Sequence, residues 1–454
     1  MAGLKRILKT PSVAFAGAGF AFATMSIVAD VQVASFMPGN TGWIAVLTGA
    51  VVCLLAASCF GELSGMFPTS AGVRVYIQKA FNEKLATTLS GAYIFTVIAA
   101  SGAEAYVFGS VFQALIPSGP PLWIWMLLAF VVVGLINYRG IELSSGVQNL
   151  LSLTMFIFLV SASLAALMQF GIRFDNWYNP VADGATVGGF ITAVAIAIFL
   201  YAGFEWVTAL SEETKDQSVI PKGMVGSIII LCIVYALLNA ALVSAVPKEV
   251  LTGKEPWIDG LFYGARPHVV FIKVVFGQYK VFGLIAVGCL SFLASMTSFN
   301  AGIMTTSRFL YAMSRDKAMP KYLSKIHMEY FTPYAAVITL VVIAITSSLL
   351  LYAFGGFDSF TFTVAGSETM IYVMAALSVM KLRKKSSDLK RPFRVAGYPI
   401  TTIAMAVIFC LLCVMVFATP EAEARIGLAI LLVIIAAMSV HTIFIIPYFR
   451  RASK

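Results

Sequence analysis

The stretch FLYAGFEWVTALSEE at residues 199–213 decides the fold, because it places a glycine and a glutamate inside a hydrophobic run. The run begins near residue 187 and is long enough to cross the hydrocarbon core of a bilayer as a helix. Gly203 lies at mid-span, where it permits an unwound turn whose free N–H and C=O groups can face a ligand. The stretch therefore predicts a broken helix that lines a cavity inside a membrane.

The composition of the whole chain agrees with a membrane protein. Of its 454 residues, 60% are hydrophobic and 11% are charged, whereas a soluble domain carries about 25% charged residues. Apolar runs of about 20 residues recur from end to end, and they are continuous rather than alternating, which favours helices over barrel strands. The net charge of +10 does not indicate nucleic-acid binding, because the basic residues lie in short segments between the runs.

We expect an all-α membrane protein in which one domain covers residues 1–454 and contains about twelve transmembrane helices. The predicted spans are 12–37, 41–66, 86–115, 121–139, 145–171, 187–211, 223–246, 277–312, 333–354, 357–380, 397–418 and 424–448. Spans 1 and 6 each begin a block of five, which predicts two repeats of inverted topology, residues 12–171 and 187–380, with discontinuous helices 1 and 6. Residues 397–448 then supply two further helices.

The loops predict the orientation of the chain. With twelve spans, most basic residues fall on one side, and the densest group runs from Lys381 to Arg394. The positive-inside rule therefore places both termini in the cytoplasm and the protein in the cytoplasmic membrane. The long connection between spans 7 and 8, which holds Pro247 and Trp257, is either an outer cap over the permeation path or a plain surface loop.

Four carboxylates lie inside predicted spans: Asp30, Glu104, Glu205 and Glu368. No lysine or arginine lies near the middle of any of the first seven spans. Because an ionisable group in a span is costly, each carboxylate is a functional candidate that either binds a cation or takes up a proton. The alternative for each is a side chain that is hydrogen-bonded to the neighbouring backbone.

Polar and aromatic residues near the two predicted breaks complete the candidate site. Span 1 is unusually polar around its centre, as a broken helix requires. The predicted substrate-binding residues are Ser26, Ala29, Asp30, Glu104, Tyr201, Gly203, Phe204, Glu205, Trp206 and Glu368. The predicted ion-coupling residues are Asp30, Glu104, Ser295 and Ser298. Ordinary packing is the alternative for the aromatic residues and for the serines.

Three motifs at the ends of spans resemble those of one transporter family. They are FGELSGMFPTSAGVRVYIQKAF at 60–81, GFEWVTALSEETKDQSVIPKGM at 203–224 and TSRFLYAMSRDKAMPKYLSKIH at 306–327. Together they resemble the amino acid–polyamine–organocation (APC) superfamily. The resemblance implies a LeuT-type fold, a substrate site between helices 1, 3, 6, 8 and 10, and alternating access driven by a proton, sodium or exchange. Glu212 and Glu213 are expected to pair with basic residues in an inner gate, and the alternative is that the charges at this face only anchor the topology.

The chain departs from the family pattern in helix 1. Amino acid carriers of the family show a glycine-rich stretch there, whose N–H groups hold the substrate carboxylate, but the corresponding residues Met25–Asp30 contain no glycine. Asp30 stands close to where that anion would lie, and like charges repel strongly in a low dielectric. We therefore predict a secondary transporter of an amine or polyamine. The alternative is a proton- or sodium-coupled amino acid transporter or exchanger, with Asp30 outside the site.

A second departure concerns the coupling ion. The lysine that many proton-coupled members carry in helix 5 is absent near Met155. A proton would then be carried by Asp30 or Glu104, whereas sodium would use Ser295 and Ser298 as oxygen ligands.

Other classes of function lack support in the sequence. The histidines are scattered, Cys410 and Cys413 have no second ligand pair, and no phosphate loop or cofactor motif is present. We expect no enzyme activity, no metal site and no cofactor apart from a coupling proton or Na⁺. The expected partners are a small-molecule substrate and the lipid bilayer, with no nucleic acid.

Overall fold

A computed structural model describes residues 4–37, 41–172, 186–245, 272, 275–276, 280–418 and 422–447. The described part is all helical apart from one isolated β-bridge. Within it, ten helices are long and apolar enough to cross a membrane, a bent pair forms an eleventh span, and a shorter apolar helix, α6, is a twelfth. The prediction of an all-α protein with about twelve spans is therefore confirmed.

The helices follow the predicted order along the chain. The first five spans comprise α1 (Thr10–Ala21) with α2 (Thr24–Phe36), then α3 (Gly42–Met66), α5 (Glu83–Leu115), α6 (Leu122–Tyr138) and α7 (Ile141–Phe170). The next five comprise α8 (Val187–Phe199) with the 3₁₀ helix η1 (Phe204–Glu213), then α9 (Val219–Ala245), α13 (Lys280–Arg315), α14 (Tyr334–Phe354) and α15 (Phe357–Lys385). The remaining elements are α4 (Gly72–Ala80), η2 (Lys321–Ser324), α16 (Ile400–Phe417), α17 (Ala422–Val440) and the π-helical turn η3 (His441–Ile445).

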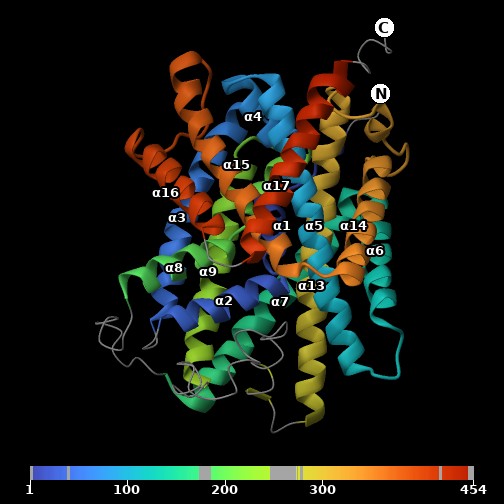
Figure 1. Cartoon of the computed structure of the whole chain (residues 1–454), viewed down its shortest axis with the longest axis vertical. Helices are drawn as coiled ribbons and strands as arrows, with labels where there is room; N and C mark the ends of the chain where they lie inside the picture. The colour runs from blue at the N-terminus through green and yellow to red at the C-terminus, as the bar shows by residue number, and fades with distance from the viewer. Residues whose placement is uncertain are drawn as a thin grey trace.

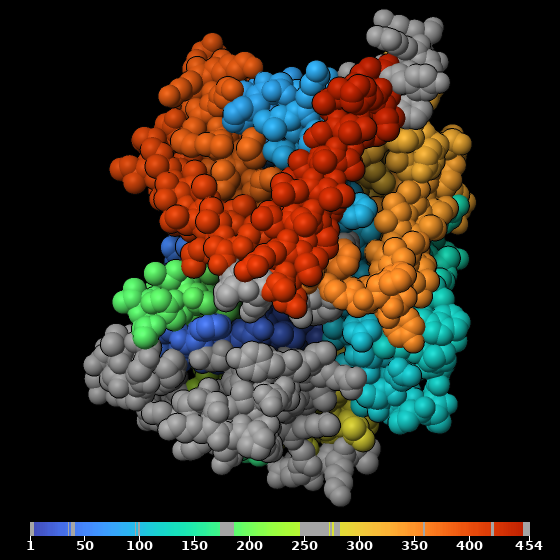
Figure 2. All heavy atoms as spheres, in the orientation of Figure 1, coloured from blue at the N-terminus to red at the C-terminus, as the bar shows by residue number. Residues whose placement is uncertain are grey.

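The long helices run roughly along one axis of the molecule, whereas α2 lies almost across it (Figure 1). The helices α16 and α17 cover much of the face shown in Figure 2. Large apolar side chains of these two helices are exposed, among them Leu411, Val414, Leu432 and Val433. An apolar surface of this kind suits contact with lipid rather than water. The connection that holds Pro247 and Trp257 lies outside the described residues.

Both predicted discontinuous helices are broken. The chain bends by 67° between α1 and α2, and the break lies at Phe22–Ala23, just before the predicted region Met25–Asp30. The second break follows α8, where Gly203 adopts a φ of 116° that favours glycine.

The two breaks touch each other. A Cβ atom on Gly203 would come within 2.3 Å of the Phe20 ring, which belongs to the last turn of α1. A glycine is therefore needed at position 203 for two reasons: the backbone is left-handed there, and α1 approaches it closely.

Gly203→Ala should destabilise the protein, because alanine adds backbone strain of about 1–3 kcal/mol at this φ and also collides with Phe20. Gly146→Ala is the matched control, since a Cβ on Gly146 of α7 meets no atom within 4 Å. We expect a clear drop in the thermal unfolding midpoint of the purified protein for Gly203→Ala and little change for Gly146→Ala. Equal midpoints would contradict the assigned role of Gly203.

Candidate functional site

The carboxylate of Glu104 lies at the first break. Glu104 is buried in α5, and its Oε1 accepts a hydrogen bond of 3.0 Å from the Thr24 amide. Its Oε2 accepts a bond of 3.3 Å from the Met25 amide. These are the first two N–H groups of α2, which the helix itself cannot pair. The Glu104 side chain therefore caps α2 from another span, at the positive end of the helix dipole.

A third donor comes from α13. The hydroxyl of Ser295 donates to Glu104 Oε1 at 2.8 Å, and Ser298 is buried one turn further along α13. Among the described residues, no lysine or arginine forms an ion pair with Glu104. Hydrogen bonds to a charged group contribute about 1.5–3 kcal/mol each. The carboxylate is thus held by backbone and hydroxyl donors without a basic partner.

The other polar groups at this break are also buried. The carbonyl of Ala21, at the end of α1, accepts a hydrogen bond of 2.8 Å from the Tyr235 hydroxyl of α9. The Thr24 side chain is buried beside the Glu104 carboxylate.

The structure places Asp30 away from this break. Asp30 lies six residues after Thr24 on α2 and is buried against α9. Its Oδ1 and its carbonyl oxygen accept hydrogen bonds of 3.2 and 3.0 Å from the Asn239 side chain. Of the other predicted residues on α2, Ser26 is buried and Ala29 is half-buried. The carboxylate beside the free amides is therefore that of Glu104, not Asp30 as the sequence suggested, because the break begins earlier in the chain than expected.

The second break holds a different carboxylate. Glu205 of η1 accepts hydrogen bonds from the hydroxyl of Tyr93 on α5 and from the hydroxyl of Tyr372 on α15, the latter at 2.8 Å. The Gly203 amide also donates to Glu205, at 3.1 Å. Glu368 is buried one turn before Tyr372 on the same helix and interacts electrostatically with Glu205.

Aromatic side chains connect the two breaks. The Trp206 indole stacks on Tyr93 with ring centroids 4.4 Å apart and on Phe20 at 6.2 Å. Phe204 packs against Phe60 of α3 at 6.3 Å. By contrast, Tyr201 points toward α3, where its hydroxyl donates to the Val46 carbonyl at 2.8 Å. Of the predicted aromatics, Trp206 therefore lies between the two breaks, Tyr201 packs on α3, and Phe204 packs on both α3 and Tyr372 of α15, at 5.8 Å from the Tyr372 ring.

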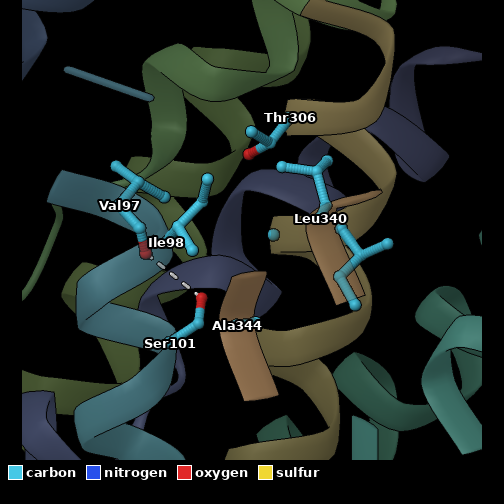
Figure 3. A pocket seen from close by; sticks show the side chains of 8 residues that line it. Val97, Ile98, Ser101, Thr306, Leu340 and Ala344 are labelled. Carbon is cyan, nitrogen blue, oxygen red and sulfur yellow. Dashed lines mark hydrogen bonds between the residues drawn. The ribbon is translucent and has the colours of Figure 1, made fainter. Parts of the chain in front are cut away.

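A small cavity lies one helical turn from Glu104. It is lined by Val97, Ile98 and Ser101 of α5, Gly302, Ile303 and Thr306 of α13, and Leu340 and Ala344 of α14 (Figure 3). Its volume of about 10 Å³ suits a single water molecule. The Thr306 hydroxyl on its wall is buried without a hydrogen-bond partner, and the Ser101 hydroxyl donates to the Val97 carbonyl at 3.2 Å.

Ion pairs close the end of the molecule where η1 ends. Glu213 and Arg308 are both fully buried and lie 3.0 Å apart. Glu212 accepts two hydrogen bonds, of 2.6 and 2.8 Å, from the Arg315 guanidinium. The predicted pairing of both glutamates with basic residues is confirmed.

Backbone contacts join the two broken spans at the same end. The amides of Ile7 and Leu8, just before α1, both donate to the Glu213 carbonyl at 2.9 Å. The extended segment before α1 is therefore fastened to the end of η1, beside the buried ion pair.

The arrangement of two touching helix breaks, a closed end and about twelve spans agrees with one family of membrane proteins. A family model described as amino acid permease matches residues 8–440. This chain belongs to the amino acid permease family of the APC superfamily. Members of this family are transporters rather than enzymes, as the sequence predicts, and the protein is a multi-pass membrane protein.

Similar proteins carry several kinds of solute. The branched-chain amino acid permease BcaP of Bacillus subtilis is 28% identical over 395 residues, which cover 82% of this chain and 80% of that protein. The methylthioribose transporter of the same organism is 26% identical, with 89% and 87% covered. Its serine/threonine exchanger SteT is 24% identical, with 79% and 78% covered.

Replacing Arg308 should lower the stability of the protein far more than replacing one partner of an exposed ion pair. Arg308→Ala leaves the Glu213 charge buried and unpaired, which costs about 3–5 kcal/mol. Lys5→Ala is the control, because the Lys5–Glu142 pair is exposed and such pairs contribute little. Thermal unfolding of the two purified variants measures the difference, and equal midpoints would contradict a structural role for the buried pair.

Proposed function

We propose that this permease is a secondary active transporter of amino acids that works by alternating access. One observation carries the proposal: the first two amides of α2 hold a carboxylate at a helix break inside the membrane. An α-amino acid presents the same chemical group, and amides at a helix start, which the helix itself cannot pair, are suited to bind it. The named amino acid substrates of BcaP and SteT agree with this choice.

The closed end of the molecule supports the alternating-access part of the proposal. The Glu213–Arg308 pair joins η1 to α13, and the backbone bonds from Ile7 and Leu8 join the segment before α1 to η1. Separating them would open a path from the breaks to this side, while the interior helices keep their packing. In this proposal, these contacts form the inner gate.

A second candidate, an amine carrier, rests on a different observation. The carboxylate that occupies the amides belongs to the protein itself, and among the described residues it has no basic partner. A solute with an ammonium group and no carboxylate could bind beside Glu104 without displacing it. Asp30 gives this candidate no support, because its carboxylate is turned toward Asn239.

Matched solutes separate the two candidates. Leucine and isopentylamine differ only in the carboxylate, as do serine and ethanolamine. In proteoliposomes loaded with the unlabelled form of the solute under test, we expect counterflow of leucine or serine and no counterflow of the matching amine. Transport of the amines alone would overturn the amino acid proposal and favour the amine carrier.

The ion-paired end should face the cytoplasm. The group from Lys381 to Arg394 lies where α15 ends, and Arg383 binds Glu62 at 2.9 Å on that side. A cysteine placed at the exposed Lys390 should react with an impermeant maleimide in inverted vesicles and not in intact cells. The reverse pattern would contradict this orientation.

A further inference from the structure

Three lysines gather where α4 ends against α15. Lys79 lies in the last turn of α4, and Lys381 and Lys385 lie one helical turn apart at the end of α15. The Lys385 ammonium donates to the Lys79 carbonyl at 3.2 Å. The Lys381 ammonium lies 4.1 Å from the centroid of the Phe81 ring, which directly follows α4. All three lysines are exposed, and we call them the α4–α15 lysine cluster.

The carboxylates near this cluster do not neutralise it. Among the described residues, none of the three lysines forms an ion pair. Glu83 at the start of α5 is bound to Arg74 at 3.2 Å, and Glu62 of α3 is bound to two arginines. Asp388 accepts a hydrogen bond of 3.0 Å from the hydroxyl of the preceding serine. The cluster therefore keeps three positive charges that an external anion can compensate.

The cluster also lies beside the lipid-facing surface. Residues of α4 and the start of α5 reach the surface between the ends of α15 and α17 (Figures 1 and 2). The end of α17 packs against α5 there, with the hydroxyls of Thr88 and Thr442 3.3 Å apart. Close by in the sequence of these helices, Phe444 is 68% exposed, and Ile400 at the start of α16 is 76% exposed. Large exposed apolar side chains of this kind suit lipid tails, so the lysines lie at the level of lipid headgroups.

We propose that the α4–α15 lysine cluster binds the phosphate group of an anionic phospholipid. Clustered basic residues just outside a span attract anionic headgroups, and the attraction grows with each lysine near the surface. The ammonium groups would donate hydrogen bonds to the phosphate oxygens, while the acyl chains lie on the neighbouring apolar surface. A soluble phosphate would have the first contact but not the second. The proposal does not depend on which solute the protein carries.

A bound headgroup would join α4 to α15 at the far end of α4 from the ion-paired end of η1. Just before α4 begins, the Ser70 amide donates to the Glu212 carboxylate at 2.9 Å. Within α4, the Arg74 guanidinium donates to Asp316, which follows α13, at 3.1 Å. The short helix α4 therefore connects the lysine cluster to the residues that hold η1. A lipid that fixes α4 to α15 should stabilise this assembly as a whole.

The test is a titration of the purified full-length protein, in neutral detergent, with phosphatidylglycerol or with the zwitterionic lipid phosphatidylcholine. Native mass spectrometry measures the bound lipid, and thermal unfolding measures its effect on stability. We expect phosphatidylglycerol to bind and to raise the unfolding midpoint, and phosphatidylcholine to do neither. Replacing all three cluster lysines by glutamine should raise the apparent Kd of phosphatidylglycerol about a hundredfold, because each lysine contributes about a factor of five.

A matched control removes the same charge from the same end of the molecule. Lys222→Gln, Lys321→Gln and Lys325→Gln together change three exposed lysines outside the cluster and should leave the Kd almost unchanged. Replacing the three cluster lysines by arginine keeps the charge, so this variant should still bind phosphatidylglycerol. It also provides the test if the glutamine variant does not fold.

The outcomes separate the possible sources of the anion. Equal affinity for the two lipids, or an equal loss of affinity in the cluster and control variants, would overturn the proposal. Glycerol phosphate or inorganic phosphate that raises the unfolding midpoint as much as phosphatidylglycerol would indicate a site for a soluble anion and would overturn the lipid assignment. A loss of binding confined to the cluster variant, with binding retained in the arginine variant, would support the proposal.

Discussion

The central constraint in this protein is that backbone groups freed by a helix break need partners inside a membrane. Water is not available there to pair them, so each unsatisfied N–H or C=O costs several kcal/mol. At the first break, Glu104 pairs two amides and Tyr235 pairs a carbonyl. These partners come from α5 and α9, so pairing the freed groups requires that two other spans are assembled against the broken one.

At the second break, the freed backbone groups and their partners are arranged differently. Glu205 folds back to accept the Gly203 amide, while tyrosines from α5 and α15 complete its hydrogen bonds. A glutamate therefore accepts hydrogen bonds from backbone amides at both breaks. Glu104 belongs to a neighbouring span, whereas Glu205 belongs to the broken helix itself. Because Tyr93 and Glu104 both belong to α5, this single helix supports both interruptions.

The sequence predicted the spans and the second break well, because both depend on local features. Apolar run length defines a span, and Gly203 marks a position that tolerates a left-handed backbone. The first break contains no glycine, so its register could not be read from residue types, and the sequence therefore pointed to Asp30 rather than Glu104 as the carboxylate beside the free amides. The partners Tyr93, Tyr372 and Asn239 were missed, because only the packing of distant helices shows which polar side chains meet.

The short pairing between Leu8 and Thr214 fastens the segment before α1 to the residue that follows η1. Residues ahead of α1 and residues at the end of η1 are bound to each other as well as to their own helices. Any movement of the start of α1 away from the end of η1 must therefore break these backbone hydrogen bonds first, so the two half-spans on this side are expected to move as one unit.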